Sequence, residues 1–130
     1  MKPADVAVWE RVIELYPLMF AEVEYDFHVG RGAQFLPDDE SSPDGRENRL
    51  YKYKIDVVGF DFDRIEVIEV KPHATMAALG QALATAEMFK EQENPELPVI
   101  PCVAAADITP DMEKVYAAAG VKTILAPAAV

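Results

Sequence analysis

The sequence contains a single cysteine, Cys102, among its 130 residues. One cysteine cannot form an internal disulfide, and a cluster of thiolate metal ligands is excluded as well. No apolar run approaches the ~20 residues that a membrane-spanning helix needs. The first residues include Lys2, Glu10, Arg11 and Glu14, which interrupt the apolar core that a signal peptide requires. We therefore expect a cytoplasmic protein with no membrane segment.

Positive charge is scarce, since 12 Lys and Arg residues face 23 Asp and Glu residues, for a net charge of −11. This balance argues against a protein that coats nucleic acid through a broadly basic surface. The distribution is uneven, however. Residues 46–54, RENRLYKYK, hold four cations and one acid. A local basic groove is therefore compatible with the acidic total.

The composition is that of a globular chain, with 51% hydrophobic and 27% charged residues. The length fits a single domain that spans residues 1–130. Helical spacing of apolar residues predicts a helix over 3–16, which Pro17 ends. Residues 20–29 alternate as a strand does, which predicts one apolar face made of Ala21, Val23, Tyr25, Phe27 and Val29. The polar stretch that follows, through residue 48, reads as a loop.

Two further strands, 50–60 and 64–71, are joined by residues 61–63, a connection short enough for a hairpin. A helix over 75–92 follows, with Thr75 as its N-cap. The strand at 97–106 contains Pro101, which indicates an edge position, a bulge or a late start. A helix over 109–120 and a strand over 121–126 complete the chain. The fold class is α/β, with a central mixed sheet that contains an antiparallel hairpin and is flanked by helices.

The hairpin brings two acids together. If its turn is centred between Phe62 and Asp63, Asp56 lies opposite Glu69. Opposed side chains share a face with their Cβ atoms about 4.5–5.5 Å apart, close enough for both carboxylates to hold one divalent cation. In this register Lys71 projects on the same face, one pleat beyond Glu69. Its ammonium can serve an attacking water or balance charge on a phosphate, so these groups suit phosphodiester hydrolysis. The ordinary alternative is a surface ion pair of Glu69 with Lys71 or Lys54, which contributes little energy.

The run KIDVVGFDFDRIEVIEVK, followed by LGQALATAEMF, resembles the PD-(D/E)XK nuclease superfamily, whose members are restriction-endonuclease-like. The pattern has an Asp on one core strand, Glu-x-Lys on the next, and a Gln on the following helix, as in the RecB-like and Holliday-junction-resolvase-like branches. The αβββαβ core of that fold is matched through the strand near residue 103. Ile55 stands where the superfamily's name has proline.

The resemblance implies a role for each matching residue. Asp56 and Glu69 would bind the metal, with the main-chain carbonyl of Val70 as a further ligand. Lys71 would serve the attacking water, and Gln81 would help to shape the site. Many members carry a Glu on the first helix, for which Glu10 is the candidate and Glu14, one turn later, the alternative. The cofactor implied is Mg²⁺, with Mn²⁺ able to substitute.

The function expected is therefore that of a metal-dependent nuclease with DNA as its substrate. The basic residues Arg49, Lys52 and Lys54 are candidates for contacts with the nucleic-acid backbone, because Lys52, Lys54 and Asp56 alternate onto one face. A homodimer or a subunit of a larger complex is expected, since one small domain cannot grip much duplex. The alternative is a catalytically inactive module of the same fold that binds nucleic acid or a protein partner. The pattern leaves open DNA or RNA, and endonuclease or exonuclease action.

Overall fold

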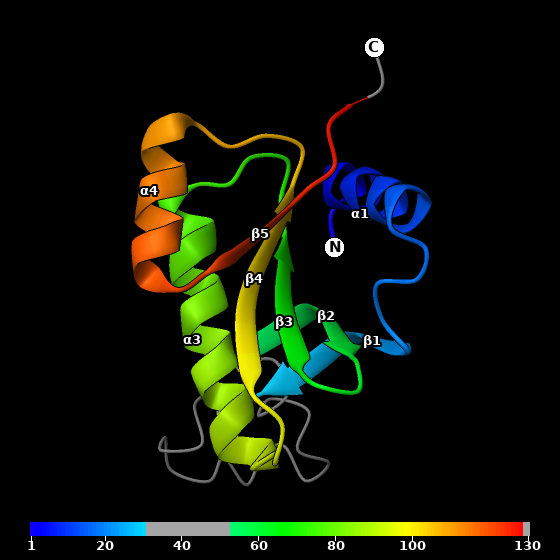
Figure 1. Ribbon diagram of the computed structural model, residues 1–130, viewed down its shortest axis with the longest axis vertical. Helices are drawn as coiled ribbons and strands as arrows, with labels where there is room; N and C mark the ends of the chain where they lie inside the picture. The colour runs from blue at the N-terminus through cyan, green and yellow to red at the C-terminus, as the bar shows by residue number, and fades with distance from the viewer. Residues whose placement is uncertain (31–52, 129–130) are drawn as a thin grey trace, which may run out of the picture.

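Within residues 1–30 and 53–128, which the computed structural model describes, five strands form one mixed sheet with helices on both faces (Figure 1). The elements follow the order that the sequence predicts. They are α1 (Pro3–Leu15), β1 (Glu22–Val29), β2 (Tyr53–Phe60), β3 (Ile65–Val70), α3 (Met76–Glu93), β4 (Val99–Ala105), α4 (Pro110–Ala119) and β5 (Lys122–Leu125). The expected loop through residue 48 and the candidate contacts Arg49 and Lys52 lie outside the described residues. No helix of the described ranges is both long and apolar enough to cross a membrane.

The strands lie in the order β1-β2-β3-β4-β5, with antiparallel pairing from β1 to β3 and parallel pairing from β3 to β5. The turn of the β2–β3 hairpin is closed by a hydrogen bond from the Asp61 N–H to the Arg64 carbonyl, at 3.0 Å. Val57 pairs with Ile68 and Phe60 pairs with Ile65. This is the predicted register, so the hairpin carries Asp56 to the neighbourhood of Glu69.

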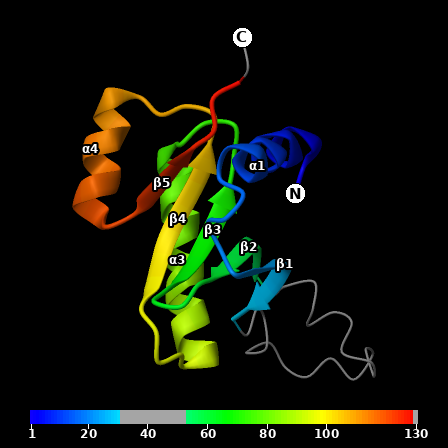
Figure 2. The same cartoon turned by 45° about the vertical axis from the view of Figure 1, so that its right-hand side comes forward.

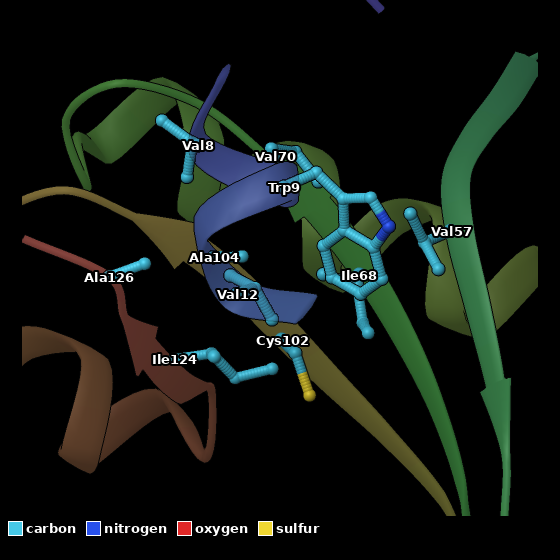
Figure 3. Packing of buried hydrophobic residues seen from close by; sticks show 10 residues of the cluster. All are labelled: Val8, Trp9, Val12, Val57, Ile68, Val70, Cys102, Ala104, Ile124 and Ala126. Atoms are coloured by element: carbon cyan, nitrogen blue, oxygen red, sulfur yellow. The ribbon is translucent and has the colours of Figure 1, made fainter. Parts of the chain in front are cut away.

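Of the described helices, α1 is the one that covers the first face of the sheet, as Figure 2 shows. Apolar residues recur along this helix at helical spacing, so they share the side that meets the sheet. Figure 3 shows how they pack against β2, β3, β4 and β5. The buried cluster contains Val8, Trp9, Val12, Val57, Ile68, Val70, Cys102, Ala104, Ile124 and Ala126.

The opposite face is covered by α3 and α4 (Figure 1). Small residues of α3, Ala78 and Ala82, allow the helix to lie close to Val103 of β4. Further along α3, Ala86 and Phe89 pack against the β2 and β3 side chains of this face. Both helices start at the threonine that the sequence indicates. Thr75 accepts a hydrogen bond from the Ala78 N–H at 3.1 Å and Thr109 accepts one from Met112 at 3.3 Å.

The prediction that β1 has a single apolar face is wrong. Val23 packs on the α1 side of the sheet, whereas Phe27 and Val29 pack on the α3 side. The change of side occurs at Asp26, whose φ of 54° lies in the left-handed region. Asp is one of the few residues apart from glycine that adopt this conformation readily. Strict alternation therefore holds on each side of Asp26 but not across it.

Of the three alternatives that the sequence leaves open for Pro101, the structure excludes the edge position, since β4 lies between β3 and β5. The Lys71 N–H donates to the Ala104 carbonyl, and the Ala126 N–H donates to the Ala105 carbonyl. The backbone N–H and C=O groups of the even-numbered β4 residues therefore point toward β3. Those of the odd-numbered residues, such as Pro101, point toward β5. Pairing with β5 begins only at Cys102. The N–H that proline lacks would have had no strand partner, which explains why it is tolerated.

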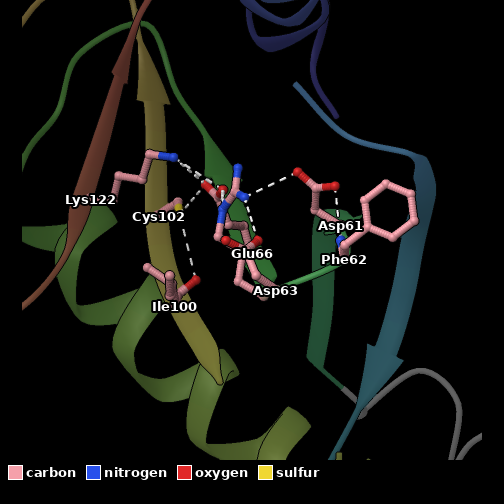
Figure 4. A network of polar contacts seen from close by, with 8 residues as sticks. Asp61, Phe62, Asp63, Glu66, Ile100, Cys102 and Lys122 are labelled. Carbon is pink, nitrogen blue, oxygen red and sulfur yellow. Dashed lines mark hydrogen bonds and ion pairs between the residues drawn. The ribbon is translucent and has the colours of Figure 1, made fainter. Parts of the chain in front are cut away.

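A charged group is fully buried on the α1 face of β3. The Glu66 carboxylate accepts hydrogen bonds from Arg64 Nε at 2.6 Å, from Lys122 Nζ at 3.0 Å and from the Cys102 thiol at 3.1 Å (Figure 4). Burial alone would raise the pKa of Glu66, but the hydrogen bonds from Lys122, Cys102 and Arg64 outweigh it and lower that pKa. The carboxylate therefore stays ionised and ties the start of β5 to β3.

Replacing Glu66 with Ala is expected to lower the free energy of unfolding by about 2–3 kcal/mol. The loss stays below that of a fully buried ion pair because Arg64 and Lys122 are partly exposed and can turn to water. Urea unfolding measures the change, with the exposed Glu113 of α4 replaced by Ala as the control. A change in Glu66→Ala no larger than that of the control would contradict this account of the network.

Candidate active site

Asp56 lies at the point where β2 and β3 part. It is buried, and its Oδ2 accepts a hydrogen bond from the Val70 N–H at 2.9 Å. The regular ladder ends at the pair Val57–Ile68, so the side chain of Asp56 takes a hydrogen bond that a strand carbonyl would otherwise accept. The carboxylate is thereby held between the two strands. Burial raises the pKa of Asp56, although the hydrogen bond from Val70 opposes the rise.

Glu69 is the second buried carboxylate of this region. It lies on β3 beside Val103 of β4. Burial, and next to it the negative charge of Asp56, raise the pKa of Glu69 to about 7 from an ordinary value of 4.5. Two buried acids whose charges repel one another are unfavourable without a cation between or beside them. The pair therefore carries an electrostatic signature that is frequent at functional sites.

Lys71 provides the nearest positive charge. Its Nζ lies 3.7 Å from Glu69 Oε1, and its side chain is about one-third exposed. The attraction of Lys71 lowers the pKa values of both acids but is outweighed by their burial. The N-terminal ammonium also lowers the pKa of Asp56, but burial outweighs the attraction of both cations.

A third acid, Asp5 of α1, acts on the same pair. Asp5 is buried, and its negative charge contributes to the raised pKa values of both Asp56 and Glu69. Its Oδ2 accepts a hydrogen bond from the Lys2 N–H at 3.1 Å within the first turn of the helix. Asp5 is not among the residues that we predicted from the sequence. Its spacing does place it on the buried side of the helix, because Asp5 stands three, four and seven residues before the buried Val8, Trp9 and Val12.

The acids of α1 that the sequence analysis did select lie elsewhere. Glu10 and Glu14 are exposed, and neither is among the charged groups that shift the pKa of Asp56 or Glu69. Asp5 is thus the α1 acid whose charge acts on the pair, and the role expected of Glu10 or Glu14 stays a prediction. Gln81 lies on α3 next to the sheet-facing Ala78 and Ala82, with its side chain exposed. Its place on the helix that covers Glu69's side of the sheet is compatible with the predicted role.

Of the three candidate backbone contacts, Lys54 is the one within the described residues. It is exposed on β2, two residues before Asp56, and its Nζ lies 3.6 Å from Asp26 Oδ1 on the neighbouring strand. The predicted contacts of Lys54, Arg49 and Lys52 with nucleic acid stay predictions.

The donor set fits a hard cation that keeps part of its water shell. Within residues 1–30 and 53–128, no three His, Cys, Asp or Glu side chains converge to hold a metal ion. A cation here would bind two carboxylates, with water and main-chain oxygen completing its coordination, as Mg²⁺ commonly does. The Val70 carbonyl is suitably directed, because in a strand it points to the same side as the N–H that reaches Asp56.

Comparison with known proteins identifies the fold. No family model matches the sequence, and the comparison with curated proteins finds no match. Among solved structures, a repair endonuclease from Pyrococcus abyssi is similar with a TM-score of 0.53 and 21% identity, over 98% of this chain and 47% of that one. EndoMS in its complex with double-stranded DNA is similar with a TM-score of 0.53 and 16% identity, over 99% of this chain and 48% of that one.

The chain shares the fold of these two solved structures, which is the fold that the sequence resemblance implies. The predicted α/β class, with its mixed sheet between helices, is confirmed. In this fold the Asp56–Glu69 pair lies where β2 and β3 part, as described above. The chain spans about half the length of the two structures that it matches. At this level of identity the likeness establishes the fold, and the chemistry has to be argued from the site itself.

Proposed function

We propose that this chain is a metal-dependent nuclease that hydrolyses phosphodiester bonds, with DNA as its substrate. The observation that carries the proposal is the buried Asp56–Glu69 pair with Lys71 beside it, at the point where the core strands β2 and β3 part. A merely structural acid pair would be expected at the surface or fully paired, as Glu66 is. The whole of residues 1–130 is proposed to form one nuclease-like domain.

Mg²⁺ is the proposed cofactor, with Mn²⁺ able to replace it. Asp56, Glu69 and the Val70 carbonyl would hold the cation, and the raised pKa values of the two acids report the negative charge that it would neutralise. When bound, the cation supplies Lewis-acid stabilisation of the charge on the phosphate. Asp5 adds negative charge near the pair without being placed among the ligands, so it strengthens the attraction for the cation.

Lys71 is the proposed group that serves the attacking water. An ammonium 3.7 Å from Glu69 Oε1 is positioned by that carboxylate and remains partly open to solvent, where a substrate phosphate has access. It can orient the water and balance charge that develops on the phosphate. Gln81 is proposed to shape the site from α3, while Lys54, Arg49 and Lys52 are proposed to contact the backbone.

DNA is favoured over RNA because of the solved structures that share the fold. One is a repair endonuclease, and the other was determined with double-stranded DNA. A homodimer, or a subunit of a larger complex, remains the proposed assembly, since the chain covers about half the length of either structure.

A second function, a binding module of this fold without turnover, is favoured by one observation. The net charge of −11 opposes tight binding of a polyanion by the chain alone. In that case the acids near Lys71 would be structural and would not require a metal ion.

Cleavage of a substrate panel separates the two functions. The panel contains supercoiled plasmid, single strands, a four-way junction, mismatched duplex and RNA, each in Mg²⁺, in Mn²⁺ and in EDTA. We expect cleavage of at least one substrate in Mg²⁺ or Mn²⁺, and we expect EDTA to abolish that cleavage. If no substrate is cut but one of them is retained in a gel-shift assay, the binding module replaces the nuclease.

A further inference from the structure

A groove of about 300 Å³ lies between α1 and β1, on the face of the sheet that α1 only partly covers. Its lining is mainly apolar and aromatic and includes Trp9, Val12, Ile13, Tyr16, Phe20 and Val23. None of the proposed catalytic residues lines it. The volume is at the lower end of the range of ligand pockets, so it suits one or two large side chains better than an extended cofactor. We refer to it as the α1–β1 groove.

The rim of the α1–β1 groove is unusually apolar. Ile13 is 47% exposed, Tyr16 is 42% exposed and Tyr25 is 48% exposed, and all three line the groove. Single exposed apolar residues are common on protein surfaces, whereas several around one hollow mark an interaction site. In the floor, the buried Trp9 is oriented by a hydrogen bond that its Nε1 donates to the Tyr25 hydroxyl at 3.0 Å.

Among the described residues, the acids around the groove outnumber the cations that are free to face it. Glu22 lines it, and Glu10 and Glu14 are exposed on the flank of α1 next to Ile13. The nearby cations are engaged elsewhere. Arg11 Nη1 donates to the Pro127 carbonyl at 3.0 Å. The guanidinium of Arg64, which lies 5.9 Å from the centre of the Phe20 ring, is paired with three acids.

We propose that the α1–β1 groove docks a basic segment of a partner protein. An apolar anchor side chain would fill the cavity, and Lys or Arg residues beside it would face Glu10, Glu14 and Glu22. Complementary charge of this kind sets specificity and speeds association. A second copy of the chain is disfavoured, because a two-fold contact through this face would set the same acids against one another. Nucleic acid is disfavoured by the same negative charge.

Trp9 offers a direct reporter, because it is the only tryptophan of the chain and lines the groove. Two synthetic amphipathic peptides without tryptophan share a Leu and Phe face, with Lys on the polar face of one and Glu on that of the other. Titration of the full chain is followed by Trp9 fluorescence. The Lys peptide is expected to change the emission and to bind at least about tenfold more tightly than the Glu peptide, with the difference shrinking at high salt.

Matched variants locate the binding. Ile13→Asp is expected to lower the affinity for the Lys peptide by about tenfold or more, since it places a charge in the apolar anchor site. Val115→Asp is the control, because Val115 is 41% exposed on α4, on the other side of the sheet. Glu14→Lys is expected to weaken binding several-fold, and Glu113→Lys on α4 is its control. Circular dichroism confirms that each variant is folded.

Three results would overturn the proposal. The first is equal affinity for the two peptides, and the second is a loss in Val115→Asp as large as that in Ile13→Asp. The third is self-association of the wild type that Ile13→Asp abolishes, which would make a second copy the occupant. None of these measurements involves cleavage, so the docking and the proposed nuclease activity can fail independently.

Discussion

Replacing Lys71 with Ala is expected to lower the rate of DNA cleavage in Mg²⁺ by about a hundredfold or more, with the fold intact. Removal of a positioned acid–base group typically costs between about a hundredfold and ten-thousandfold. Among the described residues, Lys71 is the one Lys or Arg that forms an ion pair with either acid of the Asp56–Glu69 pair. Single-turnover cleavage at saturating enzyme measures the chemical step separately from substrate binding.

The matched control is Lys90→Ala. Lys90 is a partly exposed lysine on α3 that pairs with Glu87 at 2.9 Å, far along the helix from the site. Its loss removes the same charge from the chain and should leave the cleavage rate within about threefold. Asp56→Asn should abolish cleavage as completely as Lys71→Ala does. If the Lys71→Ala variant cleaves DNA as fast as the Lys90→Ala variant, Lys71 is not the group that serves the attacking water.

The position of this site could be predicted because it depends on local sequence. The connection Asp61–Phe62–Asp63 is short, so it permits few registers, and the apolar alternation of β2 and β3 selects one of them. That register brings Asp56 and Glu69 together. Lys71 follows Glu69 by two residues and shares its side of the strand. Short-range spacing was sufficient for all three residues.

The rest of the site depends on contacts that spacing does not specify. Asp5 reaches the pair because α1 docks across the sheet, with Val8, Trp9 and Val12 as the packing face. A first-helix Glu was expected from the resemblance, which directed attention to Glu10 and Glu14. The sequence does carry the signal for Asp5, as an acid on the buried stripe. Which acid lies on that stripe depends on which side of α1 meets the sheet. Neighbouring residues of a helix point about 100° apart, so an error of one residue selects a different acid.

Glu66 and Asp26 escaped prediction for a related reason. Glu66 occupies an apolar side of β3, and its three partners come from β3, β4 and β5. Only the assembled sheet brings Lys122 and Cys102 to it. At Asp26 the backbone adopts a positive φ, so the apolar side chains of β1 change from one face of the sheet to the other. Alternation alone gives no indication of where such a change occurs.

These features divide the acids of β3 into two kinds. Glu66 is surrounded by donors, and its pKa is lowered, so it contributes to stability as an anion. Glu69, three residues later, is buried, with one ammonium at 3.7 Å and the negative charges of Asp56 and Asp5 acting on it, and its pKa is raised to about 7. The same strand therefore holds one carboxylate whose charge stabilises the fold and one whose charge opposes it. The second is the kind of group that a cation would relieve.

This contrast predicts a large pH dependence of the stability of the metal-free protein. Glu69 has a raised pKa in the folded chain, about 7 against an ordinary 4.5, so folding favours its protonated form. The resulting stability is fully present below pH 4.5 and is lost as the pH rises through 7. Since one pKa unit corresponds to about 1.4 kcal/mol, the full loss is on the order of 3 kcal/mol.

Glu69→Gln should remove this dependence, because the amide stays neutral at every pH. In EDTA the variant is expected to match the wild type near pH 4 and to exceed its free energy of unfolding by about 2–3 kcal/mol at pH 8. Urea unfolding across the pH range measures the difference. Glu91→Gln, an exposed position on α3, is the control and should follow the wild type throughout.

Mg²⁺ should reverse the order of the two proteins. If Asp56 and Glu69 hold Mg²⁺ as proposed, millimolar Mg²⁺ should raise the melting temperature of the wild type at pH 8 and restore the stability that ionisation of Glu69 removed. Glu69→Gln lacks one of the two carboxylates and should gain little. If the variant is no more stable than the wild type in EDTA at pH 8, the charge of Glu69 is already neutralised by Lys71. In that case the chain has no excess of negative charge at this site for a cation to relieve, and the metal-dependent mechanism loses its main physical support.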